Sequence, residues 1–290
     1  MDTTNIVARS AIRLAEEVKA CAIVVSGDIY FDVVTTTIPI YFASVKPKSV
    51  IEHLVSSGIE KERQAKDISD KITRDVATTI EHFENTVAIE RMLGQLTSGI
   101  VVGIVGTKNS SAIVVHDIGD NPLLKTMQEC EERVSPDVMR AVLTIAFSIA
   151  ATGREGKQVG TAFIVADEDE VMKRSHQMIL NPYMGHEDKD STVLNKQNWE
   201  SVKEFAQLDG VFVVSEYGII KAAGRYLDVD AKDIDIDKGL GGRHVSAAAI
   251  TRDTVAIAVT VSESGGVVRI FIDGKESMCI ETAERAVRRQ

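Results

Sequence analysis

The N-terminal part of the chain mixes apolar positions at helical spacing with short runs of apolar β-branched residues. Apolar residues three and four positions apart predict helices over residues 4–19 and 59–96. Short apolar runs predict strands over residues 20–25, 100–105 and 112–115. Alternation of this kind is typical of a small α/β domain.

The C-terminal part carries more sharply bounded elements. Ser135 before Pro136 is a typical helix start, and Gly153 ends the helix predicted over residues 137–151. The same reasoning predicts helices over residues 198–207 and 243–251, a helix or frayed tail over 283–289, and strands over 160–166, 211–214, 219–223, 255–261 and 267–272. We therefore expect two α/β domains, residues 1–120 and 121–290, without a flexible linker.

Composition narrows the class of protein. The 44% hydrophobic and 26% charged content is that of a globular chain. No secretory signal opens the sequence, and the longest nearly apolar run, residues 141–151, is too short to span a bilayer. The net charge of −10 argues against binding to a nucleic acid polymer, which needs a dense basic face. These features predict a cytoplasmic protein with no membrane segment.

Three short stretches in the last third could carry chemistry. In the first, Asp209-Gly210-Val211, an acid and a glycine stand at the start of an apolar strand. The acid could hold a divalent metal, and the glycine would let a ligand approach the backbone. An ordinary turn before a strand explains the same residues.

In the second stretch, the glycines at 239, 241 and 242 lead into a helix that begins with Arg243 and His244. Backbone N–H groups at a helix N-terminus bind anions, and arginine adds charged hydrogen bonds to phosphate. A cation is unfavourable for a helix N-terminus, so a structural explanation must account for Arg243. Phosphate binding and a structural helix start both remain open.

In the third stretch, Ser262 and Glu263 follow a strongly apolar strand and precede Gly265-Gly266. A glycine pair between two β-branched runs is a standard hairpin signal. The functional alternative makes Glu263 a metal or ribose ligand and Ser262 a phosphate donor.

Taken in order, these three stretches resemble the diadenylate cyclase family, whose catalytic (DAC) domain is of the DisA type. Residues 160–165, the Asn181-Pro182-Tyr183 loop and residues 220–227 fit the same family. The resemblance covers about residues 125–280 and is greatest to the archaeal, DacZ-like branch. The N-terminal half is similar to the C-terminal α/β domain of pyruvate kinase. Residues 1–120 show no catalytic constellation, so we expect an assembly or regulatory role for this domain.

The resemblance implies a mixed β-sheet flanked by helices in the C-terminal domain, and condensation of two ATP into cyclic di-AMP and two pyrophosphates. Each of two protomers, facing one another in a homo-oligomer, would hold one ATP. The ribose 3′-hydroxyl of each ATP would attack the α-phosphate of the other, with Mn²⁺ or Mg²⁺ bound.

The resemblance also implies roles for individual residues. The catalytic residues would be Asp209, Gly210, Arg243 and His244, with Asp209 and Glu263 as metal ligands. Nucleotide contacts would come from Tyr183 (near the adenine), Val211, Leu227, Gly241, Gly242, Arg243, His244, Ser246, Ser262 and Glu263.

The chain departs from the family pattern at several positions. Val245 replaces a second arginine, Gly242 a threonine and Ser264 a second acid, while Val211 stands where the family has alanine. Two alternatives therefore stay open: a non-catalytic adenine-nucleotide sensor with a degenerate cyclase domain, and a protein–protein scaffold.

Overall fold

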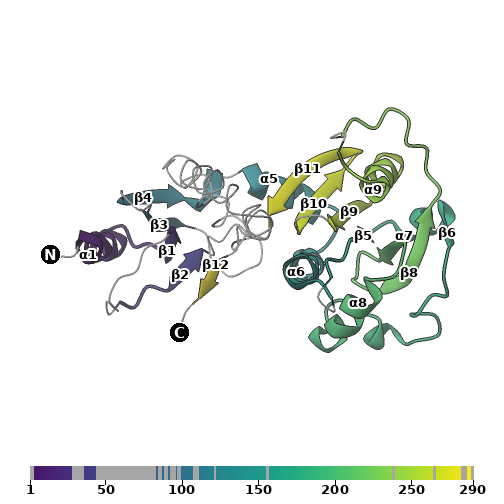
Figure 1. Ribbon diagram of the computed structural model, residues 1–290, viewed down its shortest axis with the longest axis horizontal. Helices are drawn as coiled ribbons and strands as arrows, with labels where there is room; N and C mark the ends of the chain where they lie inside the picture. Colours follow the sequence, from purple (N-terminus) through teal and green to yellow (C-terminus); the bar gives the residue numbers. More distant parts are fainter. Residues whose placement is uncertain are drawn as a thin grey trace, which may run out of the picture. The chain divides into compact units, whose positions relative to one another are not determined.

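The computed structural model describes residues 3–27, 36–43, 83, 87, 91, 96, 99–106, 111–120, 122–154, 157–236, 239–263, 266–281 and 286–288. The chain divides into two compact units (Figure 1). Unit 1 combines Met1–Leu124 with Ala283–Gln290, and unit 2 is Lys125–Thr282. Mixed sheets and helices in both units confirm the predicted α/β class.

Within the described residues, unit 1 contains a five-stranded sheet in the order β12-β2-β1-β3-β4. Strands β1, β2 and β3 run parallel, and β4 and β12 flank them in antiparallel fashion. Helix α1 packs its apolar face against β3. The elements are α1 (Thr3–Glu17), β1 (Ala22–Gly27), β2 (Ile40–Ala43), β3 (Ile100–Gly106), β4 (Ser111–Asp117), the 3₁₀ turn η1 (Ile118–Asp120) and β12 (Ala286–Arg288).

Two helical segments predicted for unit 1 differ in outcome. The helix predicted over 59–96 lies outside the described residues, apart from isolated positions such as Phe83 and Val87, which are helical and buried. The helix or frayed tail predicted over 283–289 is wrong, because Ala286–Arg288 form strand β12. Pairing with β2 is a long-range contact that local spacing does not encode, and it returns the chain end to unit 1.

Unit 2 is built on a seven-stranded mixed sheet in the order β11-β10-β9-β5-β7-β8-β6. The central strands β5 and β7 are parallel, and every other neighbouring pair is antiparallel. The strands are β5 (Thr161–Val165), β6 (Ser175–Gln177), β7 (Val211–Val214), β8 (Ile220–Leu227), β9 (Ile257–Val261), β10 (Val267–Ile272) and β11 (Lys275–Glu281). Polar β6 and bulged β11 were not predicted, since neither shows a simple apolar alternation.

Helices flank this sheet, as predicted. Helix α6 begins as the sequence indicates: Ser135 Oγ accepts a hydrogen bond from the Val138 N–H, and Gly153 closes the helix at a φ of 56°. Helices α5 and α7 were not predicted. The helices are α5 (Pro122–Glu131), α6 (Pro136–Thr152), α7 (Glu168–Lys173), α8 (Trp199–Phe205) and α9 (Gly242–Asp253), with 3₁₀ turns η2 (Asp188–Asp190) and η3 (Lys196–Asn198).

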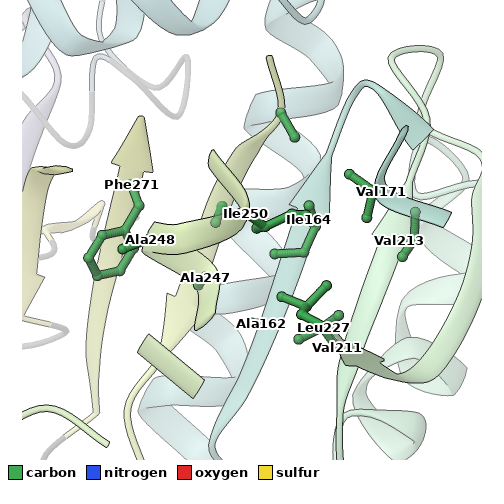
Figure 2. Close-up of a cluster of buried hydrophobic side chains, with 12 residues drawn as sticks. Ala162, Ile164, Val171, Val211, Val213, Leu227, Ala247, Ala248, Ile250 and Phe271 are labelled. Atoms are coloured by element: carbon green, nitrogen blue, oxygen red, sulfur yellow. The ribbon is translucent and has the colours of Figure 1, made fainter. Parts of the chain in front are cut away.

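One apolar cluster fixes α9 on the sheet. Figure 2 shows Ala247, Ala248 and Ile250 of α9 against side chains from the strands, including Ile164 and Phe271. Because these residues are fully buried, the helix is held firmly by its middle, and its N-terminal turn is placed at one end of the sheet. None of the helices in the described ranges is long and apolar enough to cross a membrane.

Candidate active site

Strand directions bring the three candidate stretches to the same end of the unit 2 sheet. Thr161, which opens β5, pairs with Val261, which ends β9. Strand β7 starts at this same end because it is parallel to β5, and its Val211 pairs with Arg225 near the end of β8. Residues separated by about a hundred positions along the chain therefore become neighbours.

An open cavity of about 730 Å³ lies at this end of the sheet, within the size range of ligand pockets. Its walls contain eleven of the twelve predicted site residues. The lining residues are Asp209, Gly210, Val211, Arg225, Tyr226, Leu227, Gly241, Gly242, Arg243, His244, Ser246, Val261, Ser262 and Glu263.

Arg243 joins the start of α9 to the sheet. Its Nη1 donates a hydrogen bond to the Gly160 carbonyl oxygen over 2.9 Å, and its Nη2 lies 3.1 Å from Asp209 Oδ1. The Asp209 side chain is 74% exposed, so the ion pair is open to solvent and contributes little to stability. Both charged groups can therefore exchange this contact for a ligand at small cost.

Two glycines permit the close approach of these groups. A Cβ atom at Gly160 would lie 3.0 Å from Arg243 Nη1 and 3.1 Å from the Glu263 Cβ. Gly210 has a φ of +100°, and a Cβ there would lie 2.6 Å from the Arg225 carbonyl oxygen. The glycine predicted to let a ligand approach thus also lets β7 and β8 meet.

Ser262 and Glu263 occupy the connection between β9 and β10. The Ser262 N–H donates to the Val267 carbonyl oxygen over 2.9 Å, in a hairpin between antiparallel strands. The hairpin explanation of this stretch is therefore correct, and it is compatible with a functional role because both residues line the cavity.

His244 lies in the first turn of α9 and is buried. Burial, together with the positive charges of Arg269 and Arg243, lowers the pKa of His244 to about 4. In the ligand-free chain the imidazole is therefore neutral at pH 7. Its Nε2 is buried and has no hydrogen-bond partner among the described residues.

The depressed pKa makes stability depend on pH in a defined window. Between its unfolded value of about 6.5 and its folded value of about 4, His244 binds a proton only in the unfolded chain. We expect the free energy of unfolding to fall more for wild type than for His244→Gln as pH drops through this window. Urea unfolding at several pH values measures the difference, and parallel curves would contradict the assignment.

Tyr183 is the predicted site residue that the structure does not bring to the cavity. It is 8% exposed, and its ring packs edge-on against Phe205 at 5.6 Å and Phe212 at 6.4 Å. Burial raises the pKa of its hydroxyl. The Asn181–Tyr183 loop folds back onto the apolar core, so a role for Tyr183 over the adenine is not supported by its position.

Arg225, Tyr226 and Val261 line the cavity although none was predicted. Arg225 is held by its Nε on Ser175 Oγ at 2.8 Å and by Nη2 on the Met172 carbonyl oxygen at 2.9 Å, which assigns it a structural role. Tyr226 is 50% exposed and packs at 5.3 Å on the ring of His176. A signal was present, since an arginine and a tyrosine follow the small residues Ala222-Ala223-Gly224 in β8.

Residues 148–276 match the family model described as "DisA bacterial checkpoint controller nucleotide-binding". Residues 6–119 match a second model, described as "Probable sensor domain DacZ_A". A likeness to pyruvate kinase and membership of an archaeal branch stay predictions. The first model covers all the lining residues of the cavity.

Two curated relatives carry the name diadenylate cyclase. The protein of Methanocaldococcus jannaschii is 40% identical over 164 residues, 57% of this chain and 50% of the relative. That of Haloferax volcanii is 43% identical over 144 residues, 49% of this chain and 52% of the relative. The chain thus spans about half the length of the curated relatives it matches.

Solved structures give weaker likenesses. A "hypothetical membrane spanning protein" from Bacillus cereus aligns with a TM-score of 0.40 at 16% identity, over 53% of this chain and 70% of that one. DacA from Staphylococcus aureus aligns with a TM-score of 0.34 at 21% identity, over 49% of this chain and 86% of that one.

Proposed function

We propose that this chain is a diadenylate cyclase, which condenses two ATP into cyclic di-AMP and two pyrophosphates. The relatives bearing that name and the matched nucleotide-binding family support this assignment. The observation that carries it is the meeting of Asp209, Arg243 and Glu263 with the glycine-rich start of α9 around one open cavity.

The start of α9 suits a phosphate chain. The first N–H groups of a helix have no partner within the helix, and the Gly241 N-cap has no side chain to satisfy them. No acidic residue occupies the first turn of α9, so the helix itself brings no negative charge against an anion at its N-terminus. Arg243 adds a guanidinium able to form two hydrogen bonds to phosphate oxygens.

The carboxylates fit a divalent metal shared with the substrate. Asp209 and Glu263 line the same cavity and offer hard oxygen ligands. The described residues contain no cluster of three or more His, Cys, Asp or Glu able to hold a metal alone. Mg²⁺ typically binds one or two carboxylates plus substrate phosphates, and a bound Mg²⁺ or Mn²⁺ would supply charge neutralisation and a more acidic ribose hydroxyl.

The reaction needs two ATP, and the described residues of each chain form one cavity with this lining. We therefore expect two chains to act together. In a face-to-face pair, Arg243 of each chain would orient the α-phosphate of its own nucleotide toward the 3′-hydroxyl of the other. Asp209, as a ligand of the metal, would hold the attacking 3′-hydroxyl in line with the α-phosphate. Alignment and preorganised charge, without a covalent intermediate, would account for most of the acceleration.

The direct test is incubation of the purified protein with ATP and Mn²⁺ or Mg²⁺, followed by chromatography and mass spectrometry. We expect cyclic di-AMP and pyrophosphate in a one-to-two ratio. Binding of ATP without pyrophosphate release would instead identify a nucleotide sensor. A protein that neither binds nor converts ATP would be a scaffold.

Tyr226 is proposed to stack on the adenine in place of Tyr183. Its ring borders the cavity and is supported by His176, whose Nδ1 lies 2.9 Å from both oxygens of Asp228. Stacking of a base on an aromatic ring contributes about 1–3 kcal/mol, so Tyr226→Ala should raise the KM for ATP about 5- to 150-fold. Tyr217→Ala is the control, because Tyr217 is 71% exposed and outside the cavity lining. Equal KM values for both variants would remove Tyr226 from the base site.

A further inference from the structure

The two sheets end in four edge strands within the described residues, and three of these edges discourage pairing with a further strand. Strands β12 and β6 are only three residues long. Strand β11 has an irregular register against β10 and carries Lys275, Glu276 and Glu281. Short edges, bulges and charges are the usual means by which proteins keep the edge of a sheet unpaired.

Strand β4, the fourth of these edges, has none of these features. It is seven residues long, its register against β3 is unbroken, and it contains neither proline nor lysine. Val115 in this strand is 49% exposed, and Ile6, 48% exposed, lies on α1, the helix that contacts β4. These are the two large exposed apolar side chains in the described part of unit 1. A long, regular and apolar edge is a template for pairing with another strand.

The ladder between β3 and β4 fixes which backbone groups of β4 point outward. The Ile118 N–H, just beyond the strand, donates to the Gly99 carbonyl oxygen. Because bonded and non-bonded pairs alternate in an antiparallel ladder, the even-numbered residues of β4 bond to β3, and the odd-numbered residues direct their N–H and C=O groups away from it. Of these odd-numbered residues, Ser111, Val115 and Asp117 are exposed.

We propose that β4 pairs in antiparallel fashion with β4 of a second copy of this chain, which joins the two unit 1 sheets into one. A two-fold axis beside Val114 sets this residue opposite the partner subunit's Val114, and Ile113 opposite the partner subunit's Val115. In this register the odd-numbered residues of the two strands face one another, so their outward N–H and C=O groups are paired. Asp117 faces the hydroxyl of the partner subunit's Ser111 and not a second acid.

Other registers of the two strands match less well. A shift by one residue sets odd-numbered against even-numbered residues, whose backbone groups already bond to β3. A shift by two residues leaves two residues at one end of each seven-residue strand without a partner. The strand is thus complementary to itself, which favours a second copy over an unrelated partner. Such a two-fold contact closes after two copies and does not grow into a fibre.

Oxidation of cysteine variants tests the register. In the proposed pair the two Cα atoms at position 114 are about 4.5 Å apart, within reach of a disulfide, whereas those at position 112 are about 14 Å apart along the strands. We expect Val114→Cys to give a covalent dimer as the main product of oxidation, and Ala112→Cys to give no more than wild type. Both residues are half-buried on one face of β4, which makes them a matched pair.

Wild type must be oxidised alongside, because the chain has cysteines at 21, 130 and 279. A yield of covalent dimer from Val114→Cys no higher than that from wild type would overturn the proposal. Equal yields from Val114→Cys and Ala112→Cys would also overturn it, since they would show that the strands meet without this register.

A proline in β4 tests the backbone pairing by itself. The Val115 N–H points away from β3, so Val115→Pro keeps the bonds between β3 and β4 and removes an outward donor. We expect this variant to have half of the wild-type mass or less in sedimentation velocity. Val115→Thr, which keeps the N–H and nearly the same shape, should retain the wild-type mass. Equal masses for wild type and Val115→Pro would contradict the edge pairing, and if Val115→Pro does not fold, the disulfide yields decide.

These results are separable from the proposed function. A chain that forms the Val114→Cys dimer but makes no cyclic di-AMP would refute the cyclase proposal alone. A chain that makes cyclic di-AMP but forms no such dimer would refute the edge pairing alone.

Discussion

Asp209→Asn is expected to lower the rate of cyclic di-AMP formation by about two to three orders of magnitude, the usual effect of removing one preorganised electrostatic group. The substitution removes the charge that would hold the metal and that now pairs with Arg243 at 3.1 Å. The fold should persist, because the side chain is 74% exposed. An asparagine oxygen can still accept the Gly210 N–H that Asp209 Oδ1 accepts at 2.9 Å.

Asp273→Asn is a closely matched control in the same unit. Asp273 is also exposed, at 68%, and also pairs with an arginine, Arg133, at 2.9 Å. Its φ of 50° suits asparagine, and it lies outside the cavity lining. Initial rates of cyclic product at saturating ATP and Mn²⁺ compare the two variants. Near-normal turnover of Asp209→Asn would exclude this carboxylate from the mechanism.

Arg243→Ala is expected to weaken ATP binding as well as slow the reaction. A charged hydrogen bond to phosphate is worth about 1.5–3 kcal/mol, or about a 10- to 150-fold change in affinity. Val245, two residues after Arg243, is uncharged and cannot replace the lost cation. The variant also loses the bond from Nη1 to the Gly160 carbonyl, which helps to seat the start of α9. Calorimetric titration with 3′-deoxy-ATP measures the affinity directly.

Arg133→Ala controls for the structural part of that loss. Like Arg243, Arg133 is mostly covered, pairs with an aspartate and donates to a backbone carbonyl, that of Val255. Thermal unfolding of the two variants should show similar small losses, whereas only Arg243→Ala should lose affinity for nucleotide. Similar affinities for both would place Arg243 outside the site that binds ATP before reaction.

Local residue patterns predicted much of the candidate site. Asp209-Gly210, Gly241-Gly242-Arg243 and Ser262-Glu263 each mark the end of an element, where a polar side chain is free of helix or strand packing. All of these residues line one cavity. The resemblance placed Tyr183 near the adenine, whereas its ring packs against Phe205 and Phe212 and does not line the cavity.

The structure also defines the chemistry of His244. The resemblance implies that this residue contacts the nucleotide and takes part in catalysis, without fixing its charge. Burial on the core side of the turn, against Phe271 at a ring distance of 6.4 Å, favours the neutral imidazole. Burial of one residue depends on elements distant in sequence, so no local pattern could have indicated it.

The amino-acid sequence by itself determined the α/β class, the capped α6 helix, the apolar strands and the three polar stretches, because each follows from spacing and end signals within about ten residues. The tertiary structure decided what depends on strand order. The parallel pairing of β5 with β7 and the antiparallel pairing of β5 with β9 put those stretches at one end of the sheet. The same pairings brought Arg269 beside the start of α9 and made β12 part of the first sheet, since hydrogen bonds between distant segments have no signature in local sequence.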